Sequence, residues 1–98
     1  MVKSIEIIEF EWDKGNINKN LKLHNVSDEE CEEIFFDPHK KVLKDALHST
    51  NEERYILIGK TKLERLLFLI FTVRKNKIRV ISSRNLNKKE KHLYEQKT

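Results

Sequence analysis

The order of apolar and polar residues at the start of the chain predicts a strand followed by a short helix. Residues 5–10 read Ile-Glu-Ile-Ile-Glu-Phe, and the two interposed glutamates indicate a strand with one buried face. Asp13 is a good helix N-cap, and Asn25 tolerates the left-handed backbone that often ends a helix. A helix is therefore expected over residues 16–24. Its apolar face would carry Ile17, Leu21 and His24.

A capping box predicts the start of a second helix. Ser27 is followed three residues later by Glu30, and this pair can satisfy free N–H groups of a first helical turn. Proline disfavours helical backbone in the residue before it, so Asp37-Pro38 should end this helix at about Phe36.

The second half of the chain is rich in β-branched and aromatic residues separated by short polar turns. The apolar runs fall at residues 41–47, where the pattern is weak, and at residues 54–60, 65–74 and 77–83. Short connections favour an antiparallel meander. Asn87 and Glu90 repeat the capping box and predict a terminal helix that ends at about Gln96. The expected fold class is α+β, an antiparallel sheet flanked by helices, in the order β-α-α-β-β-β-β-α.

Length and charge limit the function further. Ninety-eight residues leave room for a single domain over residues 1–98. Charged residues make up 37% of the chain, and the formal net charge is +4. Residues 74–98 alone carry nine Lys or Arg against two glutamates, a net charge of +7, which leaves −3 for the remainder. The basic part favours a polyanion such as nucleic acid, and the acidic part favours a basic partner; a solubilising charged coat is the alternative.

Several functional classes lack the residues they need. Cys31 is the single cysteine, so no internal disulfide can form, and its acidic neighbours favour a structural thiol. The first ten residues lack a signal-peptide pattern, and no apolar run approaches the roughly 20 residues of a membrane span, so a reduced cytoplasm is expected. The four histidines are scattered, and neither a glycine-rich phosphate loop nor a paired-cysteine zinc motif occurs. Neither a metal nor a cofactor is therefore expected.

Arginine remains as the side chain best suited to phosphate, because its planar guanidinium can donate two parallel hydrogen bonds. If residues 75–76 form a two-residue hairpin, Arg79 lies directly opposite Thr72. If the preceding turn consists of residues 61–64, Glu53 lies opposite Thr72 from the other side. The sequence thus predicts a row of three polar side chains across three strands.

Such a row could bind and cleave an RNA phosphodiester. The carboxylate of Glu53 would take the proton of a 2′-hydroxyl, and the guanidinium of Arg79 would stabilise the charged phosphorane. A simple salt bridge between the two on an open sheet is the alternative.

Other polar residues allow two readings each. His24 is either a core histidine or a catalytic one, and Arg84 could clamp phosphate or cap the sheet edge. Lys88, Lys89 and Lys91 are expected on a solvated helix face that attracts RNA without reading its sequence.

The motifs along almost the whole chain resemble those of the BrnT toxins of bacterial type II toxin–antitoxin systems. The matching positions are Phe10-Glu11-Trp12-Asp13, Asn20, Lys22, His24, Val26-Ser27, Glu29-Glu30, Phe35-Phe36-Asp37-Pro38, Asp45, His48-Ser49, Glu52-Glu53-Arg54, Gly59, Thr72, Arg74, the run from Ile78 to Arg84, Glu90 and Tyr94. The full series in register is specific, although each motif alone is weak. Leu23 departs from the pattern, since a basic residue is usual there, and this change removes one phosphate contact beside His24.

This resemblance implies a RelE-like fold and a small metal-independent ribonuclease that arrests translation. It also implies a BrnA-like antitoxin with a ribbon-helix-helix DNA-binding domain, and a pair of proteins that represses its own operon. The expected catalytic residues are Glu53, Arg54, Arg79, Arg84 and His24. The expected RNA-binding residues are Lys22, Thr72, Arg74, Lys88, Lys89 and Lys91. The alternative is a non-catalytic nucleic-acid- or protein-binding module in which the same residues only bind phosphate.

Overall fold

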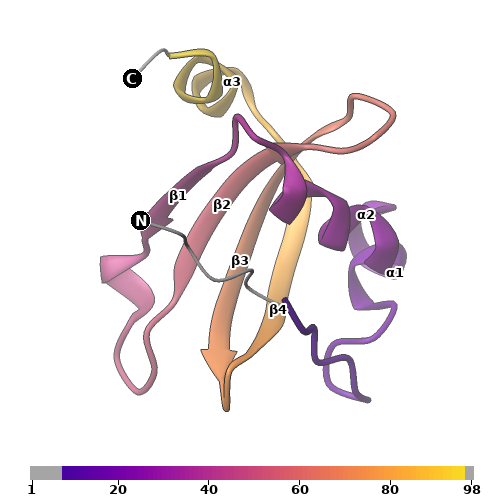
Figure 1. The fold of residues 1–98 in the computed structure, drawn as a ribbon, viewed down its shortest axis with the longest axis vertical. Helices are drawn as coiled ribbons and strands as arrows, with labels where there is room; N and C mark the ends of the chain where they lie inside the picture. The colour runs from indigo at the N-terminus through magenta and orange to yellow at the C-terminus, as the bar shows by residue number, and fades with distance from the viewer. Residues whose placement is uncertain (1–7, 97–98) are drawn as a thin grey trace, which may run out of the picture.

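A four-stranded antiparallel sheet forms the centre of the molecule (Figure 1). The computed structural model describes residues 8–96, so residues 5–7 of the predicted strand over residues 5–10 lie outside the described part of the chain. Of residues 8–10, only Phe10 forms a β-bridge, an isolated parallel one with Ile78, so this part is not a regular strand. The elements are α1 (Lys19–His24), α2 (Asp28–Glu33), η1 (Ile34–Phe36), β1 (Lys41–Lys44), η2 (Ala46–His48), β2 (Tyr55–Lys60), β3 (Leu66–Arg74), β4 (Lys77–Asn85) and α3 (Lys88–Glu95). The strands follow one another in sequence order, which confirms the predicted meander and the α+β class.

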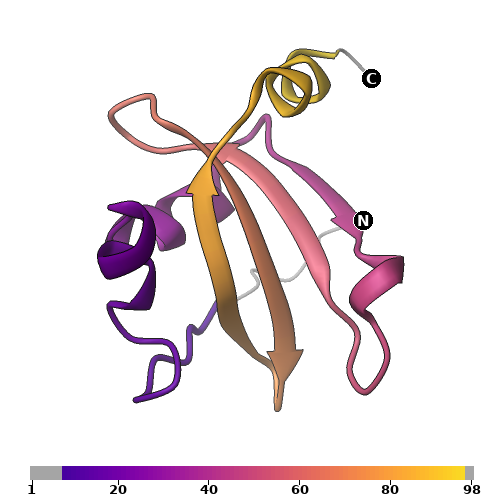
Figure 2. The same cartoon turned by 180° about the vertical axis from the view of Figure 1, so that it is seen from behind.

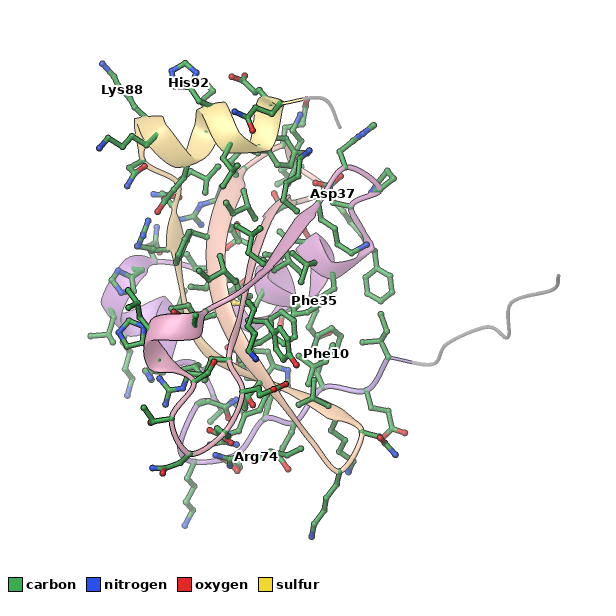
Figure 3. The ribbon with its side chains drawn as sticks, turned by 90° about the vertical axis from the view of Figure 1, so that its left-hand side faces the viewer. Phe10, Phe35, Asp37, Arg74, Lys88 and His92 are labelled. Atoms are coloured by element: carbon green, nitrogen blue, oxygen red, sulfur yellow. The ribbon has the colours of Figure 1, made fainter. Side chains whose placement is uncertain are left out.

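One face of the sheet carries the apolar core, and η1 packs over it. The buried cluster consists of Val26, Cys31, Ile34, Phe35, Leu57, Leu67, Leu69, Phe71 and Val80. Phe10 meets Phe35 edge to face, with ring centroids 5.1 Å apart, and so joins the start of the described chain to this core (Figure 3). A Cβ atom at Gly59 would lie 2.9 Å from the Cβ of Ile34. Glycine is therefore required there for η1 to approach β2.

The outer edge of β4 is covered by polar side chains, and this corrects the prediction for the first helix. The apolar pattern predicts that Ile17 and Leu21 pack inward, but their side chains are 49% and 45% exposed. Asn16 and Asn20 are buried in their place: Asn16 donates to the carbonyl of Val80, and Asn20 accepts from the N–H of Ser83. An edge strand has unpaired backbone groups, so amide side chains fit this position better than apolar ones.

The first helix is also shorter than predicted. Asn18 has a φ of 55°, a left-handed conformation that the helix interior does not tolerate, and α1 begins only at Lys19. Its end is as predicted, because Asn25 has a φ of 56°. His24, expected on the buried face, is exposed near that end.

Both predicted capping boxes are present. Ser27 accepts from the N–H of Glu30 while the Glu30 carboxylate accepts from the N–H of Ser27, and Asn87 and Glu90 repeat this arrangement at α3. The helix that Ser27 starts ends before Asp37, with its last turn as the 3₁₀ segment η1.

The second face of the sheet is largely open. Figure 2 shows it with α3 at one end and no helix of the described chain across its middle. Arg84 ties α3 to β4, because its two terminal nitrogens each lie 2.8 Å from a carboxylate oxygen of Glu90. Tyr94 ties the other end of α3 to the turn before β1 by donating to Asp37 at 2.7 Å.

Candidate active site at one end of the open sheet face

The register of the strands decides which polar side chains share the open face. Thr72 lies opposite Arg79, as the two-residue hairpin predicted. The turn between β2 and β3 was predicted one residue too short: Lys60 pairs with Leu66, so five residues separate the strands. Glu53 is therefore not opposite Thr72, and the predicted row of Glu53, Thr72 and Arg79 does not form.

A shift of one residue exchanges the two faces of a strand. Tyr55 stacks on Phe71 at the core face, and Glu53 follows it there, accepting from the Tyr55 hydroxyl at 2.7 Å and from Lys44 at 3.2 Å. The β2–β3 register, continued by one residue, places Arg54 rather than Glu53 level with Thr72 on the open face. Thr72 itself is 1% exposed and donates its hydroxyl hydrogen to the backbone carbonyl of Glu53.

Arg54 differs from the other four arginines of the chain. The guanidinium groups of Arg65, Arg74, Arg79 and Arg84 each lie within 3.1 Å of a carboxylate oxygen. Arg54 has no carboxylate partner among residues 8–96, and it is half-buried. A guanidinium that keeps its donors free is the best-suited group here for an incoming phosphate.

A polar cavity of about 340 Å³ opens beside Arg54. Its lining residues are His48, Thr50, Asn51, Glu52, Arg54 and Arg74. Arg74 is held by a bidentate contact to Glu52, with nitrogen–oxygen distances of 3.0 and 3.1 Å. The hydrogen bond from Arg74 lowers the pKa of Glu52. The positive charges of Arg54 and Arg79 lower this pKa further, whereas desolvation of the carboxylate raises it. Arg54, Arg74 and Arg79 thus all favour the ionised form of the Glu52 carboxylate.

His48, which lines the same cavity, forms a pair with Asp45 that sequence reasoning missed. His48 Nδ1 lies 3.0 Å from Asp45 Oδ2, and the Asp45 side chain is only 8% exposed. The sequence shows that Asp45 and His48 are three residues apart. This spacing brings the two side chains together only because η2 is a single 3₁₀ turn, in which residues three apart lie on the same side.

Arg79 lies on the open face, but its guanidinium is already paired with two carboxylates. Its terminal nitrogens lie 2.7 and 2.9 Å from the two carboxylate oxygens of Asp13, and one of them is 3.1 Å from Glu11. The Arg79 side chain is 14% exposed. It therefore joins the N-terminal segment to β4 in this structure.

The remaining predicted residues lie elsewhere. Figure 3 shows Lys88 and Arg74 at opposite ends of the molecule, and Lys88, Lys89 and Lys91 are all exposed on α3. Lys22 and His24 lie on α1, which packs against β4, whereas the cavity follows β1 at the other edge of the sheet. Arg84 stacks over the ring of Phe68 at 4.1 Å and holds Glu90.

The described residues give no support for a metal site, a reactive thiol or a membrane-spanning helix. Among residues 8–96 no group of three or more His, Cys, Asp or Glu is placed to hold a metal ion. Burial raises the pKa of the Cys31 thiol to about 12, so this thiol is structural rather than reactive. No helix within the same range is long and apolar enough to cross a membrane.

Comparison with known protein families matches most of the chain. Residues 12–90 match the family described as ribonuclease toxin, BrnT, of type II toxin-antitoxin system. The matched span contains the whole lining of the polar cavity and all five arginines. No curated protein matches the chain.

Proposed function

Because the chain belongs to the BrnT family of ribonuclease toxins, we propose that it cleaves RNA without a metal ion, by attack of a 2′-hydroxyl on the adjacent phosphodiester. The new bond joins the 2′-oxygen to phosphorus, and the bond to the 5′-oxygen breaks. The 2′-hydroxyl loses its proton to a base as the new bond forms, and the departing 5′-oxygen takes a proton from water. The products are a 2′,3′-cyclic phosphate and a 5′-hydroxyl. Cleavage of RNA in the cytoplasm would then arrest translation.

The free guanidinium of Arg54 beside the cavity is the observation that supports this proposal. Phosphorus gains negative charge on its oxygens as the 2′-hydroxyl attacks, and fixed donors that meet this charge lower the barrier. Arg54 can donate two hydrogen bonds to one phosphate, and Arg74 adds a second positive charge at the same cavity. Glu52 balances the charge of Arg74, so Arg54 supplies the unpaired positive charge that can stabilise the phosphorane.

A larger cavity beside α2 is a poorer place for RNA. Its volume is about 680 Å³, and its lining includes Glu29, Glu32, Glu33 and Asp37 against Lys60 and Lys62. Carboxylates repel phosphate, so the polar cavity around Arg54 is the better site for the scissile bond.

The proposal is tested with purified protein and a single-stranded RNA in EDTA. Cleavage is expected to continue and to leave 2′,3′-cyclic ends. Arg54→Ala should lower the rate by about 10² to 10³, the usual effect of losing one preorganised donor. Lys62→Ala removes the same charge at a different site and should leave the rate unchanged.

Two results would overturn the proposal. Activity that disappears in EDTA and returns with Mg²⁺ would show metal-dependent chemistry. Tight RNA binding without cleavage, by protein whose folding has been checked, would favour the non-catalytic binding module instead.

The family description also implies an antitoxin, and we infer that this partner is a BrnA-like protein with a ribbon-helix-helix domain. The antitoxin should abolish RNA cleavage when mixed with the toxin, and the pair should bind operator DNA through the antitoxin. A cognate antitoxin with another DNA-binding fold, or none, would contradict this inference.

A further inference from the structure

The register that removes Glu53 from the open face leaves the proposed reaction without its expected proton acceptor. Glu53 lies at the opposite face, with Lys44 and Tyr55. Glu52 does face the cavity, but both of its carboxylate oxygens accept from Arg74. Of the residues that line the cavity, His48 is the one possible proton acceptor not engaged by an arginine.

The Asp45 carboxylate fixes the state of the His48 ring. His48 Nδ1 lies 3.1 and 3.0 Å from the two oxygens of Asp45. An ionised carboxylate accepts only, so Nδ1 carries the hydrogen in this contact, and in the neutral ring Nε2 is left with a free lone pair. The His48 side chain is 63% exposed, so a substrate can reach that lone pair.

Backbone hydrogen bonds hold this pair close to Arg54. The N–H of Asp45 donates to the carbonyl of Arg54 at 2.8 Å. Ser49 strengthens the connection, because its hydroxyl donates to the carbonyl of Asp45 at 2.6 Å and accepts from the N–H of Arg54 at 2.9 Å. The proton acceptor and the phosphate-binding guanidinium therefore belong to one unit that joins η2 to β2.

We infer that His48 is the general base of the RNA cleavage and that Asp45 is its positioning residue, an inference that rests on the proposed function. Nε2 of His48 takes the proton of the 2′-hydroxyl as the 2′-oxygen bonds to phosphorus. Arg54 and Arg74 receive the charge of the phosphorane. The 5′-oxygen leaves with a proton from water, and the imidazolium returns its own proton to water.

His48→Ala is the direct test, with RNA cleavage in EDTA as the measurement. The rate should fall by about 10² to 10⁴, the usual contribution of a general base. Added imidazole should restore part of the missing rate in this variant, because a small base can occupy the vacated space. His92→Ala removes a histidine from α3, at the far end of the molecule in Figure 3, and should change nothing.

Asp45→Asn tests the positioning role separately. The asparagine keeps the size of the side chain and the backbone contacts but favours the wrong ring tautomer, so kcat should fall while KM stays the same.

The outcomes separate the inference from the proposed function. If His48→Ala cleaves at the wild-type rate while Arg54→Ala does not, the inference is wrong and the proposed function stands. A loss of rate that imidazole does not restore, matched by an equal loss of RNA affinity, would also overturn it, because it would show a binding role. If the folded wild-type protein cleaves no RNA, the proposed function fails first.

Discussion

Arg79 and Asp13 form a bidentate ion pair that joins the first described turn of the chain to β4. The nitrogen–oxygen distances are 2.7 and 2.9 Å, although 66 residues separate the two positions. Gly15 lets the pair form, because a Cβ atom there would lie 2.7 Å from a terminal nitrogen of Arg79. The contact makes Arg79 a clamp between distant segments.

Arg79→Ala should therefore lower the thermal stability of the protein. The variant removes the partner of both Asp13 and Glu11. We expect the melting temperature to fall by several degrees, measured by circular dichroism. Lys77→Ala, an exposed position in the same hairpin, serves as the control. An unchanged melting temperature would show that the clamp contributes nothing and would make Arg79 a candidate phosphate ligand again.

The same ion pair predicts sensitivity to acid. The hydrogen bond from Arg79, helped by the N–H of Gly15, lowers the pKa of Asp13. A carboxyl whose pKa is lower in the folded than in the unfolded state stabilises the fold above its unfolded pKa of about 3.9. That contribution should disappear as the pH falls below about 4. Urea unfolding between pH 2 and 6 should show a steeper acid loss for wild type than for Asp13→Asn; identical slopes would contradict this.

The lysines of α3 should attract RNA without taking part in cleavage. They lie at the other end of the molecule from Arg74 (Figure 3) and are exposed to solvent. Replacing Lys88, Lys89 and Lys91 together by alanine should weaken RNA binding and reduce the slope of its salt dependence by about 0.7 for each phosphate that these lysines neutralise. The rate at saturating RNA should stay at the wild-type value. A large fall in that rate, or an unchanged salt dependence, would show that α3 has a different role.

A substitution in the turn between β3 and β4 should stabilise the protein. Lys75 and Asn76 have φ values of 50° and 66°, the left-handed values of a two-residue hairpin that glycine adopts more easily. Asn76→Gly should stabilise the protein by about 0.5 kcal/mol, and Asn76→Ala should destabilise it by about 1 kcal/mol. Denaturant unfolding measures both, and the reverse order would contradict the assigned turn.

Features that depend on neighbouring residues were predictable from the sequence. The two capping boxes and the hairpin at residues 75–76 need only a few adjacent side chains, and all three are present. The turn after Lys60 was not predictable at the same precision. It holds five residues and uses a left-handed Glu64, for which the sequence offers no glycine. That one extra residue moved Glu53 to the core face and Arg54 to the open face.

Contacts between segments far apart in the chain could not be predicted from the pattern of apolar and polar residues. The pattern of apolar residues places Asn16 and Asn20 outside the buried face, whereas the edge of β4 needs hydrogen-bonding partners. The cavity around His48 likewise depends on how the turn after β1 lies against the end of β3. Neither relationship has a local signature.

The hydrogen bonds of the Glu30 carboxylate determine which segments of the molecule unfold together. It accepts from the N–H of Ser27 at the start of α2 and from Arg65, which in turn donates to the carbonyl of Asn25. Glu30 and Arg65 together thus link the end of α1, the start of α2 and the turn before β3. These three segments should open cooperatively, and their amide hydrogens should exchange with solvent at a common rate that Glu30→Gln raises in all three together.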